Sequence, residues 1–539
     1  MKKTLSLLLC ALLLCGGVLT GCDTGQKKSA KTELKLPDPV ASTDNYRNFY
    51  QIFTQSFADS NNDGVGDFQG IIEHLDYLND GDPAGGEDLG VDGIWLTPIT
   101  PSESYHKYSV EDYYNVDSSF GTIDDFDRLV EECHNRGINI ILDLVLNHIS
   151  YKNPLFLNAC EEVQRGKLDG DAQYFEFHEP DYYSADTKVV HVGDYVCEAN
   201  FSETMPEWNL SSDKTREEFK KIAKFWLDRG VDGFRLDAVK YFENKHTDGV
   251  EFLTWFVNTC HELKDDVYLV GEDWSDDSEI KEYYASGIDS LFAFRFAQST
   301  GEIVQSISTT EGQSLAKKIS GYDSKMSEVK SDFINAVFLS NHDQTRIANA
   351  LEGRGLEAEK FAANVYMLVP GNSFTYYGEE IGMKSDKNGS DRYHRMPMVF
   401  DSDNPQAISV EGEKTSIEPK YGGVKQQLTD ENSLLNHYRA LISAKLSYPA
   451  IARGRITSQC SFNDSAVGAY FIEHEGSKLL VIHNFSADDE KSLTVTDEMM
   501  KDPQVALFFG QTAKADVPAV KDGKLKLPAL SSVVLCTKS

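Results

Sequence analysis

Basic residues are scarce in this sequence of 539 residues, where 52 lysines and arginines stand against 86 aspartates and glutamates and give a formal net charge of −34. Nucleic-acid binding relies on basic patches, so this balance excludes nucleic acid as a partner and suits a neutral ligand. The chain also lacks a glycine-rich phosphate loop. Its nine cysteines have no spacing typical of a zinc site. Apolar residues still make up 40 %, as in folded soluble proteins, and the length is too great for one ordinary domain.

The N-terminus lacks a comfortable membrane span. The basic segment MKK precedes the apolar run TLSLLLCALLLCGGV, which is short for a transmembrane helix and typical of a targeting signal. The following LTGC, ending at Cys22, resembles the lipobox of bacterial lipoproteins, whose cysteine is lipidated and becomes the mature N-terminus. We therefore expect a lipoprotein signal peptide over residues 1–22, a flexible linker over residues 23–45, and a lipid-anchored, extracytoplasmic protein at the bacterial cell surface. An ordinary secretory signal with an incidental cysteine is the alternative.

Six cysteines remain after this segment: Cys133, Cys160, Cys197, Cys260, Cys460 and Cys536. Cys133 and Cys260 fall within amphipathic helical stretches, where we expect buried thiols. Cys160 with Cys197, or Cys460 with Cys536, could form disulfides, and spacing alone leaves this open.

From about residue 46 the sequence alternates strand-like and helix-like segments. Thr122 and Asp125 are placed to cap a helix, Gly137 ends it, and INIILDLVLN follows as a buried strand. Eight strand-like segments occur in all: NFYQIF, GIWLTPI, NIILDLVLN, GFRLDAV, VYLVGED, SLFAFRF, NAVFLSNHD and NSFTYYGEE. The pattern predicts an α/β fold, a parallel (β/α)8 TIM barrel, with an open doubly wound sheet as the structural alternative.

Two segments depart from a plain barrel. Residues 148–212 are irregular, aromatic-rich and too long for an ordinary loop, so we expect a small inserted domain after the third strand. From about residue 450, short strands such as KLLVIHNF and SSVVLCT predict a C-terminal all-β sandwich domain over residues 450–539. The barrel would then comprise residues 46–147 and 213–449.

The stretch FADSNNDGVGDF, residues 57–68, carries oxygen donors at alternating positions around a glycine bend. This spacing suits a hard cation, and we expect a Ca²⁺ site formed by Asp59, Asn61, Asp63, the carbonyl of Val65, and Asp67. It is not an EF-hand, because Gly70 stands where the twelfth-position glutamate would be. A solvated turn rich in Asx residues is the alternative.

Ionisable residues collect at the predicted C-terminal ends of strands, where barrels of this kind place their chemistry. Arg235 and Asp237 are two residues apart on the fourth strand and face the same side. The ends of the third, fifth and seventh strands supply His148, Glu272, His342 and Asp343. Glycoside hydrolysis needs one carboxyl as proton donor and a second carboxylate as nucleophile or base. Arg235 is expected to lower the pKa of the neighbouring Asp237 and keep it ionised, as a nucleophile requires.

The segments DLVLNH, GFRLDAVKY, VGED and FLSNHD resemble the four central motifs of the α-amylase family, glycoside hydrolase family 13. GVDGIWLTPI, MPEWN and YYGEE resemble its three additional motifs, in the same order, and the likeness covers roughly residues 46 to 450. The resemblance implies a retaining double displacement on α-glucans. In it, Asp237 is the nucleophile, Glu272 the general acid/base, and Asp343 grips substrate hydroxyls.

The same resemblance implies further substrate contacts, made by Arg235, His148, His342 and Lys240. YHKY resembles the family's YHGY, in which His106 and Tyr108 line the cleavage subsite, although Lys107 replaces the glycine. Trp208 and Trp274 are candidate stacking platforms. The loop after the first strand is similar to a structural calcium loop of related members. A second calcium site is doubtful, since Asn147 matches one ligand but Tyr241 stands where many members have histidine.

The run LDAVK, with Lys240 placed to contact sugar beyond the cleaved bond, favours an α-amylase acting within α-1,4 chains of starch or maltodextrins. The alternatives are an exo-acting α-glucosidase or oligo-1,6-glucosidase, a maltogenic enzyme, and a glucanotransferase, in which sugar intercepts the covalent intermediate. A lipid-anchored glucan-binding protein without activity would share the composition, but such proteins usually lack one of the three carboxylates. We expect a monomer. Chain-length preference and tolerance of α-1,6 branches are left open.

Overall fold

The computed structural model describes residues 42–537, except 83–85, 185, 387–389 and 415–418, together with Pro37 and Pro39. The predicted signal peptide, the lipidation site Cys22 and most of the predicted linker lie outside the described residues. Among the described helices, none combines the length and apolar character needed to cross a membrane. The predicted barrel, insertion and C-terminal domain all fall within the described region.

Eight parallel strands form one central sheet and confirm the predicted barrel. They are β1 (Asn48–Ile52), β2 (Gly93–Leu96), β3 (Asn139–Leu144), β7 (Gly233–Leu236), β8 (Tyr268–Gly271), β9 (Ser290–Leu291), β10 (Ala336–Phe338) and β11 (Asn372–Tyr376). Their spatial order is β10-β11-β1-β2-β3-β7-β8-β9. The two edges meet where Phe292 bridges Ala336 and the Ala293 N–H donates to the Ala336 carbonyl at 2.9 Å. The barrel is therefore nearly closed, which excludes the open doubly wound alternative.

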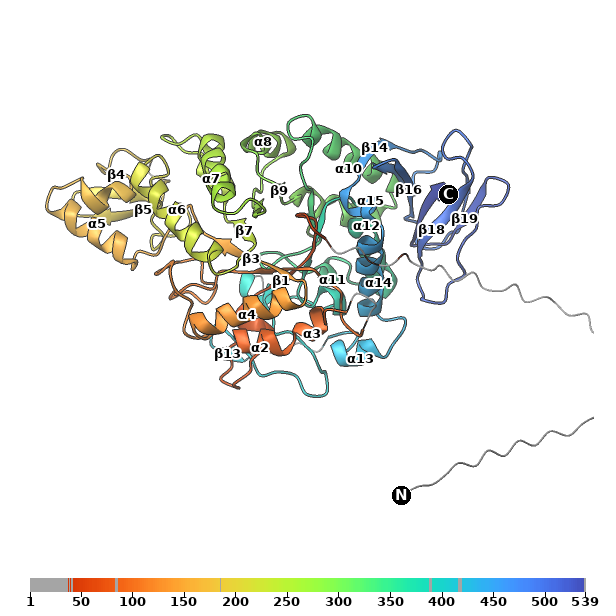
Figure 1. Cartoon of the computed structure of the whole chain (residues 1–539), viewed down its shortest axis with the longest axis horizontal. Coiled ribbons are helices and arrows are strands. Elements are labelled where there is room, and N and C mark those ends of the chain that lie inside the picture. Colours follow the sequence, from red (N-terminus) through yellow and green to blue (C-terminus); the bar gives the residue numbers. More distant parts are fainter. Residues whose placement is uncertain are drawn as a thin grey trace, which may run out of the picture.

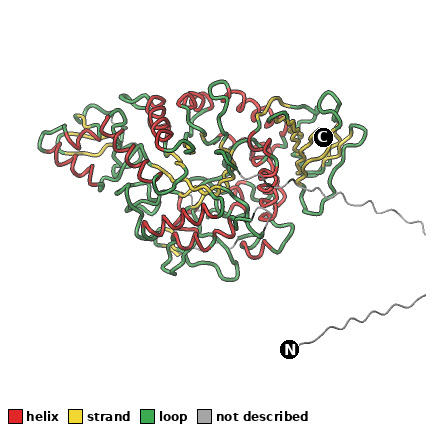
Figure 2. Tube along the Cα trace, in the orientation of Figure 1, coloured by secondary structure: helices red, strands yellow, loops and turns green. Residues whose placement is uncertain are grey.

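Helices surround this sheet (Figures 1 and 2). The longer ones are α2 (Phe68–Glu73), α4 (Ile123–Asn135), α6 (Asp213–Leu227), α7 (Gly249–Leu263), α8 (Asp277–Tyr283), α9 (Glu302–Thr309), α10 (Gly312–Ser327), α12 (Leu356–Met367) and α14 (Leu434–Ser447). Shorter turns are α1 (Thr54–Phe57), α3 (Leu75–Leu78), α11 (Ile347–Ala350), α13 (Val424–Leu428), α15 (Pro449–Arg453), η2 (Val239–Phe242), η3 (Tyr284–Ser286), η4 (Phe294–Phe296), η5 (Glu379–Ile381) and η6 (Asp391–His394). A hairpin of β12 (Ser409–Val410) and β13 (Glu413–Lys414) follows β11.

Helix α4 begins and ends as its sequence predicts. Thr122 accepts a hydrogen bond from the Asp125 N–H at 3.2 Å, and the Asp125 carboxylate accepts from the Thr122 N–H at 3.0 Å. Gly137, with φ +73°, follows its end and turns the chain toward β3.

The barrel interior is filled largely by aromatic rings. Phe49 of β1 stacks on Phe374 of β11 at 4.7 Å and on Tyr268 of β8 at 5.3 Å between ring centroids. Neighbouring residues such as Tyr50 and Ile52 point the other way, into the apolar layer under the helices. A packed interior leaves the C-terminal mouth of the barrel as the place for chemistry.

The segment between β3 and α6 forms a separate projection, gold at the left of Figure 1. It contains α5 (Pro154–Gln164), η1 (Gly170–Tyr174) and a three-stranded sheet of β4 (Phe177–His178), β6 (Tyr195–Glu198) and β5 (Val189–Val192). Bridges between His148 and Glu207 and between Phe175 and Trp208 tie its ends together.

The C-terminal region, blue at the right of Figure 1, consists of antiparallel sheets. The larger has the order β14 (Arg455–Gln459), β15 (Val467–His474), β16 (Ser477–Asn484), β20 (Ser531–Thr537) and β18 (Pro503–Phe509). The smaller pairs β17 (Lys491–Thr494) with β19 (Lys524–Leu527), and one apolar cluster joins the two sheets. All six cysteines of the described region are free thiols, so neither candidate disulfide is formed, and Cys133 and Cys260 are buried as predicted.

Candidate active site

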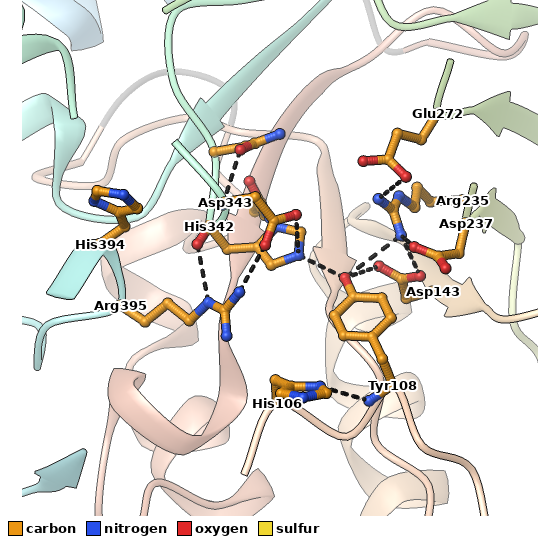
Figure 3. A network of polar contacts seen from close by, with 12 residues as sticks. His106, Tyr108, Asp143, Arg235, Asp237, Glu272, His342, Asp343, His394 and Arg395 are labelled. Atoms are coloured by element: carbon orange, nitrogen blue, oxygen red, sulfur yellow. Dashed lines mark hydrogen bonds and ion pairs between the residues drawn. The ribbon is translucent and has the colours of Figure 1, made fainter. Parts of the chain in front are cut away.

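Three carboxyls surround one arginine at the mouth of the barrel (Figure 3). Arg235, on β7, donates from Nη1 to Asp143 and to Asp237, each at 2.6 Å. Its Nη2 lies 3.0 Å from Glu272 Oε2. The Arg235 side chain is only 1 % exposed. The fold thus gathers Asp237 and Glu272, two of the predicted catalytic carboxyls, around a single guanidinium.

The charge balance of this cluster differs from the sequence-based expectation. Burial raises the pKa of Asp143 to about 6, and Arg235 only partly opposes this. Burial also raises the pKa of Asp237, while Arg235 acts in the lowering direction and Glu272 and Asp143 add repulsion. Arg235 does act to lower the pKa of Asp237, but burial and the two other carboxyls outweigh it, so the expectation that Arg235 keeps Asp237 ionised is wrong for the ligand-free protein. It considered one pair, whereas one buried cation here serves three carboxyls.

Glu272 is held by the strained backbone that follows Asp237. Ala238 has φ +53° and ψ +41°, a left-handed conformation that is costly for a residue with a Cβ. In this conformation its N–H donates to Glu272 Oε2 at 3.0 Å. The indole Nε1 of Trp274 donates to the other oxygen, Oε1, at 2.7 Å. Both oxygens of Glu272 are thus oriented before any ligand binds.

A second cluster, from β10 and the segment after β11, faces the first. Asp343 accepts from Arg395 Nη2 at 2.6 Å and lies 3.0 Å from His342 Nε2. Burial would raise the pKa of Asp343, but His342, Arg395 and Arg235 together hold it at about 2. Burial lowers the pKa of His342 to about 3, so this ring is neutral near pH 7. The side-chain amide nitrogen of Gln51 lies 2.7 Å from Nδ1 of His342. Because an amide nitrogen can only donate, Nδ1 accepts this hydrogen bond and the ring hydrogen is on Nε2.

Tyr108 connects the two clusters. Its hydroxyl donates to Asp143 at 3.0 Å, and its ring stacks on His342 with 5.6 Å between centroids. Burial lowers the pKa of the adjacent His106 to about 4. Between them, Lys107 has φ +66°, the conformation that glycine adopts without strain. Its ammonium pairs with Asp117 at 2.6 Å, which anchors the loop despite the missing glycine.

The other predicted substrate contacts lie around this centre. His148 is 2 % exposed, its Nδ1 is 3.3 Å from Asn147 Oδ1, and its Nε2 is buried without a hydrogen-bond partner among the described residues. Lys240, on η2, is exposed and projects outside the network. Asn147 donates directly to the Tyr241 carbonyl at 3.0 Å, so a protein hydrogen bond joins the two positions considered for a second calcium.

The two candidate stacking tryptophans differ sharply. Trp274 is 45 % exposed beside Glu272 and is available to a sugar ring. Trp208 is 2 % exposed and stacks on Phe175 at 5.2 Å inside the inserted segment. Trp208 is therefore a packing residue, and its proposed role as a platform is wrong.

The predicted calcium loop follows β1 and α1. Its aspartate side chains accept hydrogen bonds from the backbone of the loop itself: Asp59 accepts from the Asn62 N–H at 2.7 Å, and Asp63 from the Val65 N–H at 2.9 Å. Asp67 caps α2 by accepting from the Gly70 N–H at 2.6 Å. The donors, all oxygens around a glycine with φ +92°, fit a hard cation. The three aspartates do not bring one oxygen each within 4.8 Å of one another, however, so calcium stays a prediction.

Sequence reasoning missed three members of the network. Asp143 is the first residue of DLVLNH, a motif in which the sequence points only to Asn147 and His148, and Arg395 lies in DRYHRMPM, which has no periodicity. Gln51 sits on β1 among apolar residues. The available signal was a single polar residue interrupting an otherwise apolar buried strand, which applies to Asp143 and Gln51.

Comparison with known proteins agrees with this geometry. Residues 51–454 match the family described as alpha amylase, catalytic domain, and residues 467–534 match the alpha-amylase SusG C-terminal domain. Alpha-amylase 3 of Dictyoglomus thermophilum is 35 % identical over 449 residues, which is 82 % of this chain and 85 % of the relative. The structure of Eubacterium rectale Amy13B aligns with a TM-score of 0.84 and 36 % identity, covering 93 % of this chain and 97 % of that one. A 4-alpha-glucanotransferase of Thermotoga neapolitana is 28 % identical, over 81 % of this chain and 95 % of the relative.

Proposed function

The chain belongs to the α-amylase family of glycoside hydrolases, and on this premise we propose that it hydrolyses internal α-1,4-glucosidic bonds of starch or maltodextrins with retention of configuration. The observation that carries the proposal is the pair Asp237 and Glu272, both bound to the guanidinium of Arg235 at the barrel mouth. Retention requires two carboxyls that are near neighbours, because one must attack the carbon whose leaving oxygen the other protonates.

In the first step, Glu272 donates its proton to the glycosidic oxygen while Asp237 attacks the anomeric carbon. The carbon–oxygen bond breaks, the reducing-side sugar leaves as an alcohol, and a glycosyl ester forms on Asp237. In the second step, Glu272 takes a proton from water, the water oxygen attacks the anomeric carbon, and Asp237 is released as carboxylate. The cycle therefore starts with Asp237 ionised and Glu272 protonated, and the second step, which begins from the Asp237 ester and the Glu272 carboxylate, restores this state.

Asp343 serves the transition state in this scheme. Held ionised by Arg395 and His342, it accepts hydrogen bonds from sugar hydroxyls and offsets the positive charge that develops at the anomeric carbon. His342 and His148 are buried and His106 is half-buried. All three are neutral near pH 7 and suit hydrogen bonding to sugar hydroxyls. Tyr108 offers an aromatic face for the sugar ring, and Lys240 is available to sugar units beyond the cleaved bond.

The proposal also includes a structural calcium ion in the loop after β1 and a lipid anchor at Cys22. Calcium held by Asp59, Asn61, Asp63, the Val65 carbonyl and Asp67 would brace the loop after β1 and supply no chemistry to the reaction. Lipidation at Cys22 would hold a monomeric enzyme at the outer side of the bacterial membrane, within reach of polymeric substrate. The carbonyl of Gly64, in the predicted calcium loop, accepts a hydrogen bond from the Ser409 N–H at 2.7 Å. Calcium in this loop would therefore also stabilise the segment after β11.

The test uses the soluble chain without residues 1–22 and a matched Asp237→Asn variant. Each is incubated with maltoheptaose and with starch, products are separated by chromatography, and the anomer first formed is read by proton NMR. Mixed short maltodextrins of α configuration, absent with the variant, are expected. Glucose alone from chain ends would replace the proposal with an exo-acting α-glucosidase, and products longer than maltoheptaose with a glucanotransferase. The initial β anomer would overturn retention.

A further inference from the structure

A cluster of metal-binding side chains lies outside the network described above. Glu176 precedes β4, His178 lies on β4, and His246 lies in the loop between η2 and α7. Each offers one ligand atom, and these atoms lie within 4.8 Å of one another. Glu176 Oε2 is 3.5 Å from His178 Nε2 and 3.4 Å from His246 Nε2. The catalytic scheme uses none of the three.

The backbone on the inserted side aims two of these side chains the same way. Residues 175–178 read Phe-Glu-Phe-His, and alternate residues of an extended segment share a face. The two phenylalanines pack against Phe156, with 4.9 Å from the Phe175 ring and 6.3 Å from the Phe177 ring. Glu176 and His178 are left on the other face, and β4 is fixed by pairing with β6.

The backbone on the barrel side fixes the third. Asn244 accepts from the N–H groups of His246 at 2.8 Å and Thr247 at 2.9 Å, and its own N–H donates to the Thr247 carbonyl. These hydrogen bonds close a turn within residues 244–247 and fix the main chain of His246. The imidazole therefore reaches Glu176 from a separate rigid element.

Two of the three separations between ligand atoms match a tetrahedral zinc site, and the third is within 4.8 Å. With bonds of about 2.0–2.2 Å to nitrogen and oxygen, the ligand atoms of tetrahedral zinc lie about 3.3–3.5 Å apart. The two Glu176–histidine separations fall in this range. Two imidazoles with one carboxylate suit zinc among divalent ions, whereas calcium takes oxygen ligands. We propose that Glu176, His178 and His246 bind one Zn²⁺ ion that joins the inserted segment to the barrel.

Tyr182 borders the fourth coordination position. Its hydroxyl contacts His246 Nε2, and its ring stacks on His178 with 3.7 Å between centroids. Zinc binding replaces the hydroxyl contact to Nε2, and the fourth ligand is then water or the Tyr182 oxygen. The ammonium of Lys245 lies 4.7 Å from the Tyr182 ring centroid, so its charge is directed at the ring.

The zinc ion would have a structural role and would take no part in the reaction. His246 lies shortly after η2, which carries Lys240 and follows β7 and Asp237. Joining this loop to β4 fixes the inserted segment relative to the barrel. Removal of zinc should increase hydrogen exchange in residues 176–183 and 244–248 while leaving exchange in the C-terminal sheets unchanged.

The test measures zinc in the folded mature chain. The protein is purified with calcium in excess and treated with 1,10-phenanthroline, which removes transition ions and spares calcium. It is then titrated with Zn²⁺ by calorimetry and with Co²⁺ by visible absorption. One equivalent of zinc and the intense bands of tetrahedral cobalt are expected. Glu176→Gln, His178→Ala and His246→Ala should each weaken zinc binding at least tenfold.

His191→Ala is the matched control, because His191 is an exposed histidine on β5 of the same inserted segment. It should keep the full equivalent. No zinc binding by the wild-type chain, octahedral cobalt bands, or equal losses in His191→Ala and His246→Ala would each overturn the site. Glu176→Gln preserves shape and serves where a histidine variant folds poorly, with circular dichroism as the check.

Discussion

Arg235 and Asp143 form an ion pair at 2.6 Å in which the arginine side chain is 1 % exposed and the aspartate side chain 0 % exposed. Asp143 also accepts from the Tyr108 hydroxyl at 3.0 Å and from the Trp95 indole at 3.3 Å. It therefore orients the guanidinium that holds Asp237 and Glu272, although it lies on β3, one strand away from Asp237 and two strands away from Glu272. We regard Asp143 as a positioning residue for the nucleophile.

Asp143→Asn should lower kcat roughly 100-fold, the scale of a small misplacement of reacting groups, and change KM little. The substitution also removes a negative neighbour of Asp237, so the pKa of Asp237 should fall and the acid limb of the pH–rate profile should move to lower pH. Kinetics on maltoheptaose across pH give both quantities. Asp127→Asn, which breaks a surface pair with Arg229 at 2.9 Å, is the control and should leave both unchanged. An unshifted profile would mean that Asp143 acts only in folding.

The sequence could predict the barrel because its signals are local. Apolar runs of strand length, the capping residues Thr122 and Asp125, and the helix-ending Gly137 each depend on near neighbours. The strand-end positions of Asp237, Glu272 and Asp343 follow from the fold class. The pairing of Asp143 with Arg235 spans 92 residues, and no local pattern encodes it.

The remaining misses come from tertiary burial. Trp208 and Trp274 look alike in sequence, and only packing decides that one is buried and the other exposed. The pKa direction of Asp237 was mispredicted for the same reason, because burial and two further carboxyls outweigh one adjacent cation. Arg395 could not be found since its segment has neither strand nor helix periodicity.

Arg395→Lys should impair activity by acting through Asp343. The guanidinium donates to Asp343, to the His342 carbonyl and to the Tyr105 hydroxyl, and an ammonium cannot reproduce this planar fork. We expect kcat/KM to fall roughly 10- to 100-fold. The pKa of Asp343 should rise, which moves loss of activity to higher pH on the acid side.

The control for this prediction is Arg392→Lys. Arg392 precedes it in the same segment and pairs with Glu411 at 3.2 Å and Glu413 at 3.3 Å at the surface. Exposed pairs contribute little, so its pH–rate profile should match that of the unmodified chain. Equal effects of the two substitutions would argue that the segment, rather than Arg395, sets the behaviour of Asp343.

Lys107 allows a paired test of backbone strain beside the cleavage subsite. Its φ of +66° is unfavourable for residues with a Cβ, and its ammonium is bound to Asp117. Lys107→Ala and Lys107→Gly both lose the ion pair, but only glycine relieves the strain. The glycine variant should therefore be more stable than the alanine variant by about 1 kcal/mol, measured by urea unfolding. The alanine variant equalling glycine would show that φ at this position costs nothing.

Buried histidines should make the protein unstable in acid. Burial lowers the pKa of four histidines to about 3. They are His148 and His342 in the active site, His437 in α14 and His483 in β16. Above pH 6.5 neither the folded nor the unfolded chain protonates them. Between pH 6.5 and 3 these histidines bind protons in the unfolded chain but not in the folded chain. As the pH falls through this range, the free energy of unfolding therefore decreases by about 1.4 kcal/mol per pH unit for each histidine.

His483→Asn isolates one contribution, because His483 lies in β16, outside the active site, where its Nδ1 faces Ser532 at 2.8 Å. Urea unfolding at pH 7.5, 5.5 and 4.5 should show a shallower dependence on pH in the variant, by about one proton per molecule. Loss of packing can lower the stability of the variant at pH 7.5. The prediction is therefore judged only by the slope of the unfolding free energy against pH. An identical slope in both proteins would mean that His483 is protonated in the folded state and that burial does not control its pKa.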